Sequence, residues 1–111
     1  MYNLGEGVRQ DYTKAAHWFE KAANQGNADT QYNLGLMYYK GLGVRHDYSK
    51  TVEWYTKAAK QGHAKAQFNL GLMYAKGEGV RQNYIVAKEY FGKACDGGLQ
   101  KGCDGYRLLN E

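Results

Sequence analysis

The chain has 111 residues, of which 43% are hydrophobic and 23% are charged, as in an ordinary globular protein of one domain. Its net charge of +4 is spread as single cations among acidic and amide residues, without the dense basic patch of a nucleic-acid-binding protein. No apolar segment approaches the ~20 residues needed to cross a bilayer. We therefore expect neither a nucleic-acid partner nor membrane insertion.

Glycines and a few other residues recur along the chain at a fixed interval. Gly5, Gly41 and Gly77 stand 36 residues apart. The same interval separates Gly7, Gly43 and Gly79; Val8, Val44 and Val80; Tyr12, Tyr48 and Tyr84; and Gly26, Gly62 and Gly98. Such a period indicates stacked repeats that bury their apolar faces against one another. We divide the chain into a tail of a preceding repeat (1–4), two full repeats (5–40 and 41–76) and a third with a degenerate C-terminal cap (77–111). The sequence thus predicts the C-terminal end of a longer array.

Each repeat carries the signals of two helices. Asp47 stands where a carboxylate can accept the first free backbone N–H groups of a helix. Apolar and small residues then follow at i, i+3, i+4, i+7 and i+8, namely Thr51, Trp54, Tyr55, Ala58 and Ala59. Gly62 comes directly after them, as a helix-ending glycine does. The predicted helices are 11–25, 28–40, 47–61, 64–76, 83–96 and 100–109. The segment around Gly77 and Gly79, and its earlier copies including Gly5 to Val8, are predicted to be turns.

Three motifs carry a family resemblance that covers essentially the whole chain. They are Asn-Leu-Gly-Leu-Met-Tyr at 69–74, Gly-x-Gly-Val at 77–80, and Asp-Tyr-x-Lys-x-x-x-Trp-Tyr-x-Lys-Ala-Ala at 47–59. They resemble the Sel-one-like repeat (SLR), a relative of the tetratricopeptide repeat. The resemblance implies an all-α, right-handed α-solenoid of helix–turn–helix repeats. It also implies a non-enzymatic bacterial scaffold or adaptor that binds a protein or peptide, with no cofactor. We expect the chain to be monomeric.

The same resemblance implies where a partner binds. In tetratricopeptide-like arrays the first helix of each pair lines the concave groove, which here means 28–40 and 64–76. The expected contact residues are Tyr32, Asn33, Leu36, Tyr39, Lys40, Lys65, Phe68, Asn69, Leu72 and Lys76. Leucines and aromatic rings would form an apolar strip, and the lysines would meet carboxylates. Asn33 and Asn69 suit packing between repeats equally well.

Cys95 and Cys103 are the two cysteines of the chain and lie on either side of a Gly-Gly turn. In repeat register they stand at the positions of Ala59 and Gln67. A disulfide is geometrically reasonable here, and two reduced thiols or a metal site are the alternatives. The arrangement resembles the cysteine-rich members of the SLR family, in which each helix pair carries such a bridge. A disulfide would place the protein in an oxidising compartment, periplasmic or secreted, although the sequence shows no signal peptide.

The cysteine-rich relatives raise an enzymatic alternative, a penicillin-interacting or β-lactamase-like protein. That chemistry normally uses a serine in an S-x-x-K motif with a downstream K-T-G. Ser49 is the one serine; no lysine stands three residues after it, and there is no K-T-G. The histidines, His17, His46 and His63, occupy three different repeat positions and are predicted to lie separately on the surface. We therefore expect no catalytic residues.

Overall fold

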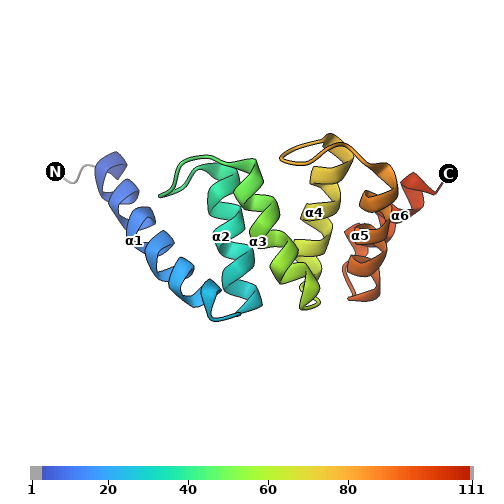
Figure 1. The fold of residues 1–111 in the computed structure, drawn as a ribbon, viewed down its shortest axis with the longest axis horizontal. Coiled ribbons are helices and arrows are strands. Elements are labelled where there is room, and N and C mark those ends of the chain that lie inside the picture. Colours follow the sequence, from blue (N-terminus) through green and yellow to red (C-terminus); the bar gives the residue numbers. More distant parts are fainter. Residues whose placement is uncertain (1–3, 111) are drawn as a thin grey trace.

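The computed structural model describes residues 4–110, with side chains from residue 12 onward. In this range the chain forms six helices and no strand (Figure 1). They are α1 (Leu4–Asn24), α2 (Ala28–Lys40), α3 (Tyr48–Lys60), α4 (Ala64–Lys76), α5 (Tyr84–Asp96) and α6 (Gln100–Leu109). Each helix packs mainly against its neighbours in sequence, and the molecule is elongated, 54 × 26 × 24 Å. The fold is the predicted α-solenoid, and α2 to α6 match the expected ranges within one residue at each end.

The core lies between successive helices because each repeat buries its apolar face on the next. Residues of α3 and α4 form its largest cluster: Tyr55, Ala58, Ala59, Ala66, Leu70 and Met73. The close packing of a helix against the one that follows it depends on two glycines at equivalent repeat positions. A Cβ on Gly35 would lie 2.6 Å from a ring carbon of Tyr55, and one on Gly71 would lie 2.7 Å from Phe91. The glycines therefore leave room for an aromatic ring from the following helix.

Side chains at the helix starts accept backbone hydrogen bonds. Asp47 accepts one from Lys50 N at 3.1 Å, as predicted, and Asn83 does the same at the start of α5. Asn27 begins α2 in this way and His63 begins α4, whereas Leu99 gives α6 no side-chain cap. Each cap satisfies a donor that the first turn leaves free. The last helix lacks this contribution.

Two of the predicted glycine turns are present, and the first copy is not. The loops after α2 and α4 contain Gly43 and Gly79 at φ 72° and 73°. A Cβ on Gly79 would lie 2.6 Å from the carbonyl oxygen of Tyr48, so the loop rests on the first turn of the preceding repeat. Residues 5–8 instead belong to α1, which begins at Leu4. The predicted turn there is wrong: no helix precedes α1 among the described residues, so this copy has nothing to rest on. Of the expected tail at 1–4, residues 1–3 lie outside the described residues, and Leu4 is the first residue of α1.

Candidate partner-binding groove

A row of hollows follows the helices α2, α4 and α6. The largest, about 360 Å³, lies between α4 and α6. A second, of about 210 Å³, lies between α2 and α4, and a third, of about 240 Å³, lies near the starts of α2, α4 and α6. Leu72 lines the first and second hollows, and Phe68 lines the first and third. Because they share these residues, the hollows form one continuous strip, which we call the groove.

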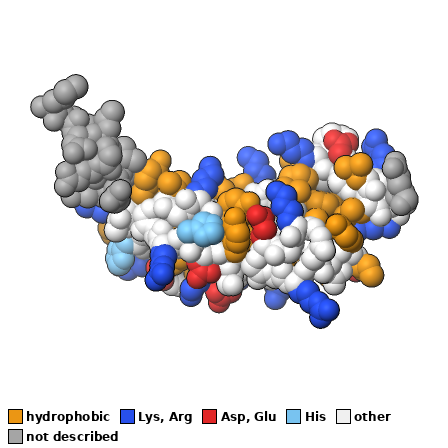
Figure 2. Space-filling model, turned by 90° about the horizontal axis from the view of Figure 1, so that it is seen from above, with side chains coloured by type: hydrophobic (Ala, Val, Ile, Leu, Met, Phe, Trp, Pro, Cys, Tyr) orange, Lys and Arg blue, Asp and Glu red, His pale blue; other side chains and the backbone are white. Residues whose placement is uncertain are grey.

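All ten residues expected at the concave face line these hollows or the adjoining one on α1. Leu36, Tyr39, Lys40 and Lys76 surround the second hollow, and Tyr32 and Lys65 belong to the third. Asn33 lines a further hollow of about 320 Å³ beside Tyr12 and Phe19. Seen from above, the C-terminal half of the molecule carries a group of hydrophobic side chains, and Lys and Arg side chains lie among and around them (Figure 2). The structure thus brings the sequence-predicted residues together on one surface.

Asn69 contributes to packing between repeats within the groove. Its Nδ2 donates a hydrogen bond to the Tyr32 hydroxyl at 3.2 Å, across two successive repeats. The Tyr32 ring stacks on Tyr55 at 5.4 Å between centroids. Burial raises the pKa of Tyr55 far above its ordinary value, and so the hydroxyl stays protonated. Asn33, by contrast, is exposed, and its side chain has no described hydrogen bond.

Tyr39 connects α2 to the loop that follows α4. Its hydroxyl donates to the Glu78 carboxylate at 3.2 Å, and its ring lies 5.1 Å from that of Tyr48. Burial, and then the neighbouring Glu78 charge, raise the pKa of Tyr39. The contact fixes one wall of the second hollow and occupies the Glu78 carboxylate.

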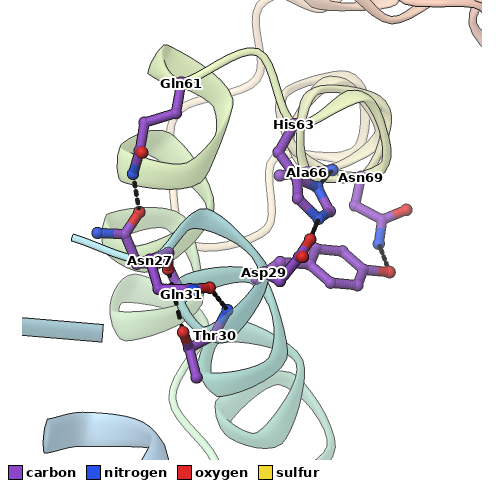
Figure 3. A network of polar contacts seen from close by, with 9 residues as sticks. Asn27, Asp29, Thr30, Gln31, Gln61, His63, Ala66 and Asn69 are labelled. Carbon is purple, nitrogen blue, oxygen red and sulfur yellow. Dashed lines mark hydrogen bonds and ion pairs between the residues drawn. The ribbon is translucent and has the colours of Figure 1, made fainter. Parts of the chain in front are cut away.

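His63 lies in a polar network between the two repeats, not free on the surface as predicted (Figure 3). Its Nδ1 accepts from Ala66 N at 3.1 Å, which caps α4, and its Nε2 lies 3.0 Å from Asp29 Oδ1. The imidazole also stacks on Tyr32 at 4.7 Å, and its side chain is 14% exposed. Because Nδ1 accepts a hydrogen bond, the neutral ring carries its proton on Nε2. This N–H donates a hydrogen bond to the Asp29 carboxylate. The prediction failed because a helix cap at this position was not considered.

The helices α1, α3 and α5 hold lysines in a different way from the groove. Lys21, Lys57 and Lys93 are spaced by one repeat, and each lies over an aromatic ring, those of Trp18, Trp54 and Tyr90. The groove lysines are Lys40, Lys65, Lys76 and Lys101. They are exposed, and in the part of the chain that the structure describes they have neither an ion pair nor a ring partner.

Sequence reasoning missed the contribution of α6 to the groove. Lys101, Leu108 and Leu109 line the largest hollow, together with Phe91 of α5. The sequence predicts a degenerate cap at the end of the third repeat, and a cap is not expected to line the groove. The register did hold a signal, because Lys101 stands one repeat after Lys65.

The cysteines are joined in the structure as a Cys95–Cys103 disulfide, with their Cα atoms 4.6 Å apart. The alternatives of free thiols and a metal site are not what the structure shows; among the described residues no group of three His, Cys, Asp or Glu side chains could hold a metal ion. Ser49 is exposed at the start of α3, and its side chain has no described hydrogen bond. None of the described helices has the length and apolarity to span a membrane.

The chain is similar to several solved SLR structures. A Sel1 repeat protein from Oxalobacter formigenes is 38% identical with a TM-score of 0.85; the match covers 87% of this chain and 40% of that one. The protein c5321, a protective antigen present in uropathogenic Escherichia coli strains, displays an SLR fold and is 42% identical with a TM-score of 0.82, over 89% of this chain and 21% of that one. Helicobacter pylori cysteine-rich protein B is 28% identical with a TM-score of 0.77, over 80% of this chain and 67% of that one.

This chain therefore spans less than half the length of the first two proteins. A search of curated proteins gives no match. The Sel1 repeat family model matches residues 1–27, 28–63 and 64–99, so its units begin 36 residues apart at the starts of α2 and α4. Proteins with these repeats are generally protein-interaction scaffolds. The fold, the motifs and the match over most of the sequence agree: the chain belongs to the Sel1 repeat family.

Proposed function

We propose that the protein is a non-enzymatic scaffold that binds a protein or peptide segment in the groove along α2, α4 and α6. The observation that carries this proposal is the continuity of the hollows, which share Phe68 and Leu72 and so offer one apolar strip. A strip of this kind suits an extended or helical segment that lays apolar side chains into successive hollows. Its polar edge would supply orientation and specificity.

The disulfide supports a periplasmic or secreted location for this scaffold. Protein thiols are kept reduced in most cytosols, whereas disulfides persist in oxidising compartments. The test is the intact mass of protein isolated from its native compartment under thiol-blocking conditions. Two blocked thiols on that protein would contradict the location, because the bridge would then not form where the protein works.

The groove is best tested with a displayed library of random peptides of about twelve residues, followed by binding measurements on the selected sequences. Leu108→Gln removes an exposed apolar side chain from the largest hollow. Ile85→Gln is its matched control, because Ile85 is 75% exposed and Leu108 is 71% exposed, but Ile85 lines none of the described hollows. Leu72→Gln tests the junction of two hollows.

We expect Leu72→Gln and Leu108→Gln to weaken the selected peptides by about fivefold to twentyfold, in line with the loss of a buried aliphatic contact. Ile85→Gln should bind like the parent protein. Circular dichroism would show that each variant keeps its helices. Equal binding by all three variants, or a library from which no peptide is enriched, would contradict the groove as the binding site.

A further inference from the structure

We propose that the segment bound in the groove is acidic, with Asp or Glu residues beside the apolar residues that enter the hollows. This inference rests on the proposed binding function and adds the chemistry of the partner. Four lysines line the three groove hollows, Lys40, Lys65, Lys76 and Lys101. The two acidic residues there are Glu78 and Asp104. The groove lining therefore has a positive balance of 4 − 2 = 2 charges.

Both acidic groups of the groove already have internal partners. Glu78 accepts the hydrogen bond of the Tyr39 hydroxyl at 3.2 Å. Asp104 accepts one from Gln100 Nε2 at 3.1 Å, within the same helix. The lysines of the groove have no such partner among the described residues. Unpaired cations beside an apolar strip are complementary to carboxylates on a ligand, and such complementarity favours specific association and fast encounter.

Lys65 and Lys101 are the most informative of these lysines, because a cation at their positions does not stabilise the helix that carries it. Each is the second residue of its helix, α4 or α6, and neither helix has an acidic residue in its first turn. A cation at a helix N-terminus opposes the helix dipole, whereas Lys40 and Lys76 lie in the last turns, where a cation is favourable. Asp29 holds the position equivalent to Lys65 in α2. Lys65 and Lys101 are thus poorly placed for helix stability and well placed for a ligand anion.

These two lysines also share a hollow with an apolar anchor. Lys65, Lys101 and Phe68 line the third hollow, and Phe68 and Lys101 line the largest one as well. A ligand side chain that packs on Phe68 would therefore bring its neighbouring residues close to both ammonium groups. The lysines of α3 and α5 differ, since Lys57 and Lys93 lie over the rings of Trp54 and Tyr90. That difference provides a control with the same change of net charge.

The test uses the peptides selected from the random library, with the full chain as bait. We expect enrichment of Asp and Glu next to Leu or Phe. The double variant K65Q/K101Q should weaken the binding of such a peptide by about fivefold to twentyfold at low salt, the effect of two partly exposed ion pairs. K57Q/K93Q should change it by less than about twofold, since neither lysine lines a groove hollow and the change reaches the ligand only through the long-range field. A peptide with its acidic residues replaced by Asn or Gln should bind both double variants and the parent equally weakly.

Each contrary result has a distinct meaning. Peptides that need Leu72 and Leu108 but show no acidic enrichment, or that respond equally to K65Q/K101Q and K57Q/K93Q, would overturn the acidic partner and leave the groove intact. Peptides insensitive to Leu72→Gln and Leu108→Gln, or no enrichment at all, would remove both proposals. A dimer in light scattering that Leu108→Gln dissociates would show a second copy in the groove, and would also overturn the acidic peptide.

Discussion

The turns between paired helices are cross-linked at the same point in two different ways. In the first two turns a buried glutamine reaches back to the preceding helix: Gln31 Nε2 donates to Ala23 O at 3.1 Å, and Gln67 Nε2 to Ala59 O at 3.0 Å. In the last turn the Cys95–Cys103 disulfide occupies these same repeat positions. A covalent bond has thus replaced a recurring hydrogen bond. Each turn thus carries a link at this point, and the link in the last turn is covalent.

The helix α6 has fewer supports than α2 and α4. Those two helices pack between a preceding and a following helix, whereas α6 packs mainly on α5 within the described residues. They also begin with side-chain caps, from Asn27 and His63, whereas Leu99 offers none. Since stability in a solenoid is carried by neighbouring elements, we expect α6 to detach before α2 and α4. The disulfide holds the part of the groove that α6 contributes.

The largest effect is expected from breaking the disulfide. The variant C95A/C103A should lose about 2–3 kcal/mol of stability in the last helix pair, the loop-closure contribution of so short a span. Hydrogen exchange should show faster exchange of the α6 amides and little change in α2 to α4, because coupling in a solenoid falls with distance. Reduced wild-type protein serves as the control and should match the variant. Unchanged α6 protection would show that packing on α5 suffices.

The next largest effect is expected from replacing Gln31 or Gln67, and the two losses of stability should differ. Both polar atoms of the Gln31 side chain are hydrogen-bonded, since its Oε1 also accepts a hydrogen bond from Gln61 Nε2 at 2.9 Å. In Gln67 the buried Oε1 has no partner among the described residues, because Gly97 stands where Gln61 would be in the next repeat. Gln31→Leu should therefore cost about 1–2 kcal/mol, and Gln67→Leu about 1 kcal/mol less. Urea denaturation measures both. A larger loss for Gln67→Leu would mean that its orphan oxygen has a partner in solution.

Two substitutions would convert the last turn into a copy of the first two. C95A/C103Q recreates the alanine and glutamine of the first two turns. It should recover about 1 kcal/mol relative to C95A/C103A, the net value of one buried hydrogen bond. C95A/C103L is the matched control, with similar volume and no amide donor. Equal stability of the glutamine and leucine variants would show that the α5–α6 turn cannot form the bond.

Most of the fold was predictable because period and helix signals agree in this sequence. Asp47, Gly62 and the apolar face between them define α3 without reference to any neighbour. The first copy of the glycine turn was predicted wrongly because its form depends on a helix for the loop to rest on. Local sequence carries the tendency to turn, and tertiary contact decides whether the turn forms.

The groove was predictable where the repeat is regular and not where it degenerates. Positions on α2 and α4 followed from the register, so Leu36 and Leu72 were identified. Leu108 was missed because α6 has lost the repeat signature and its packing on α5 is visible only in three dimensions. His63 was missed for another reason: histidine is an uncommon helix cap, and the residues that hold it, Asp29 and Tyr32, come from the preceding repeat.

The smallest expected effect concerns the hydrogen bond that Gln31 accepts from Gln61. Gln61→Ala removes the donor to Gln31 Oε1 and leaves a buried acceptor without its partner, at a cost of about 0.5–1 kcal/mol. Gln25 holds the equivalent position one repeat earlier, is exposed and has no described side-chain hydrogen bond. Gln25→Ala is therefore the matched control and should change the urea midpoint very little. If both variants lose stability equally, the loss comes from the turn itself and not from the link, and the ranking of the three turns by their cross-links would be wrong.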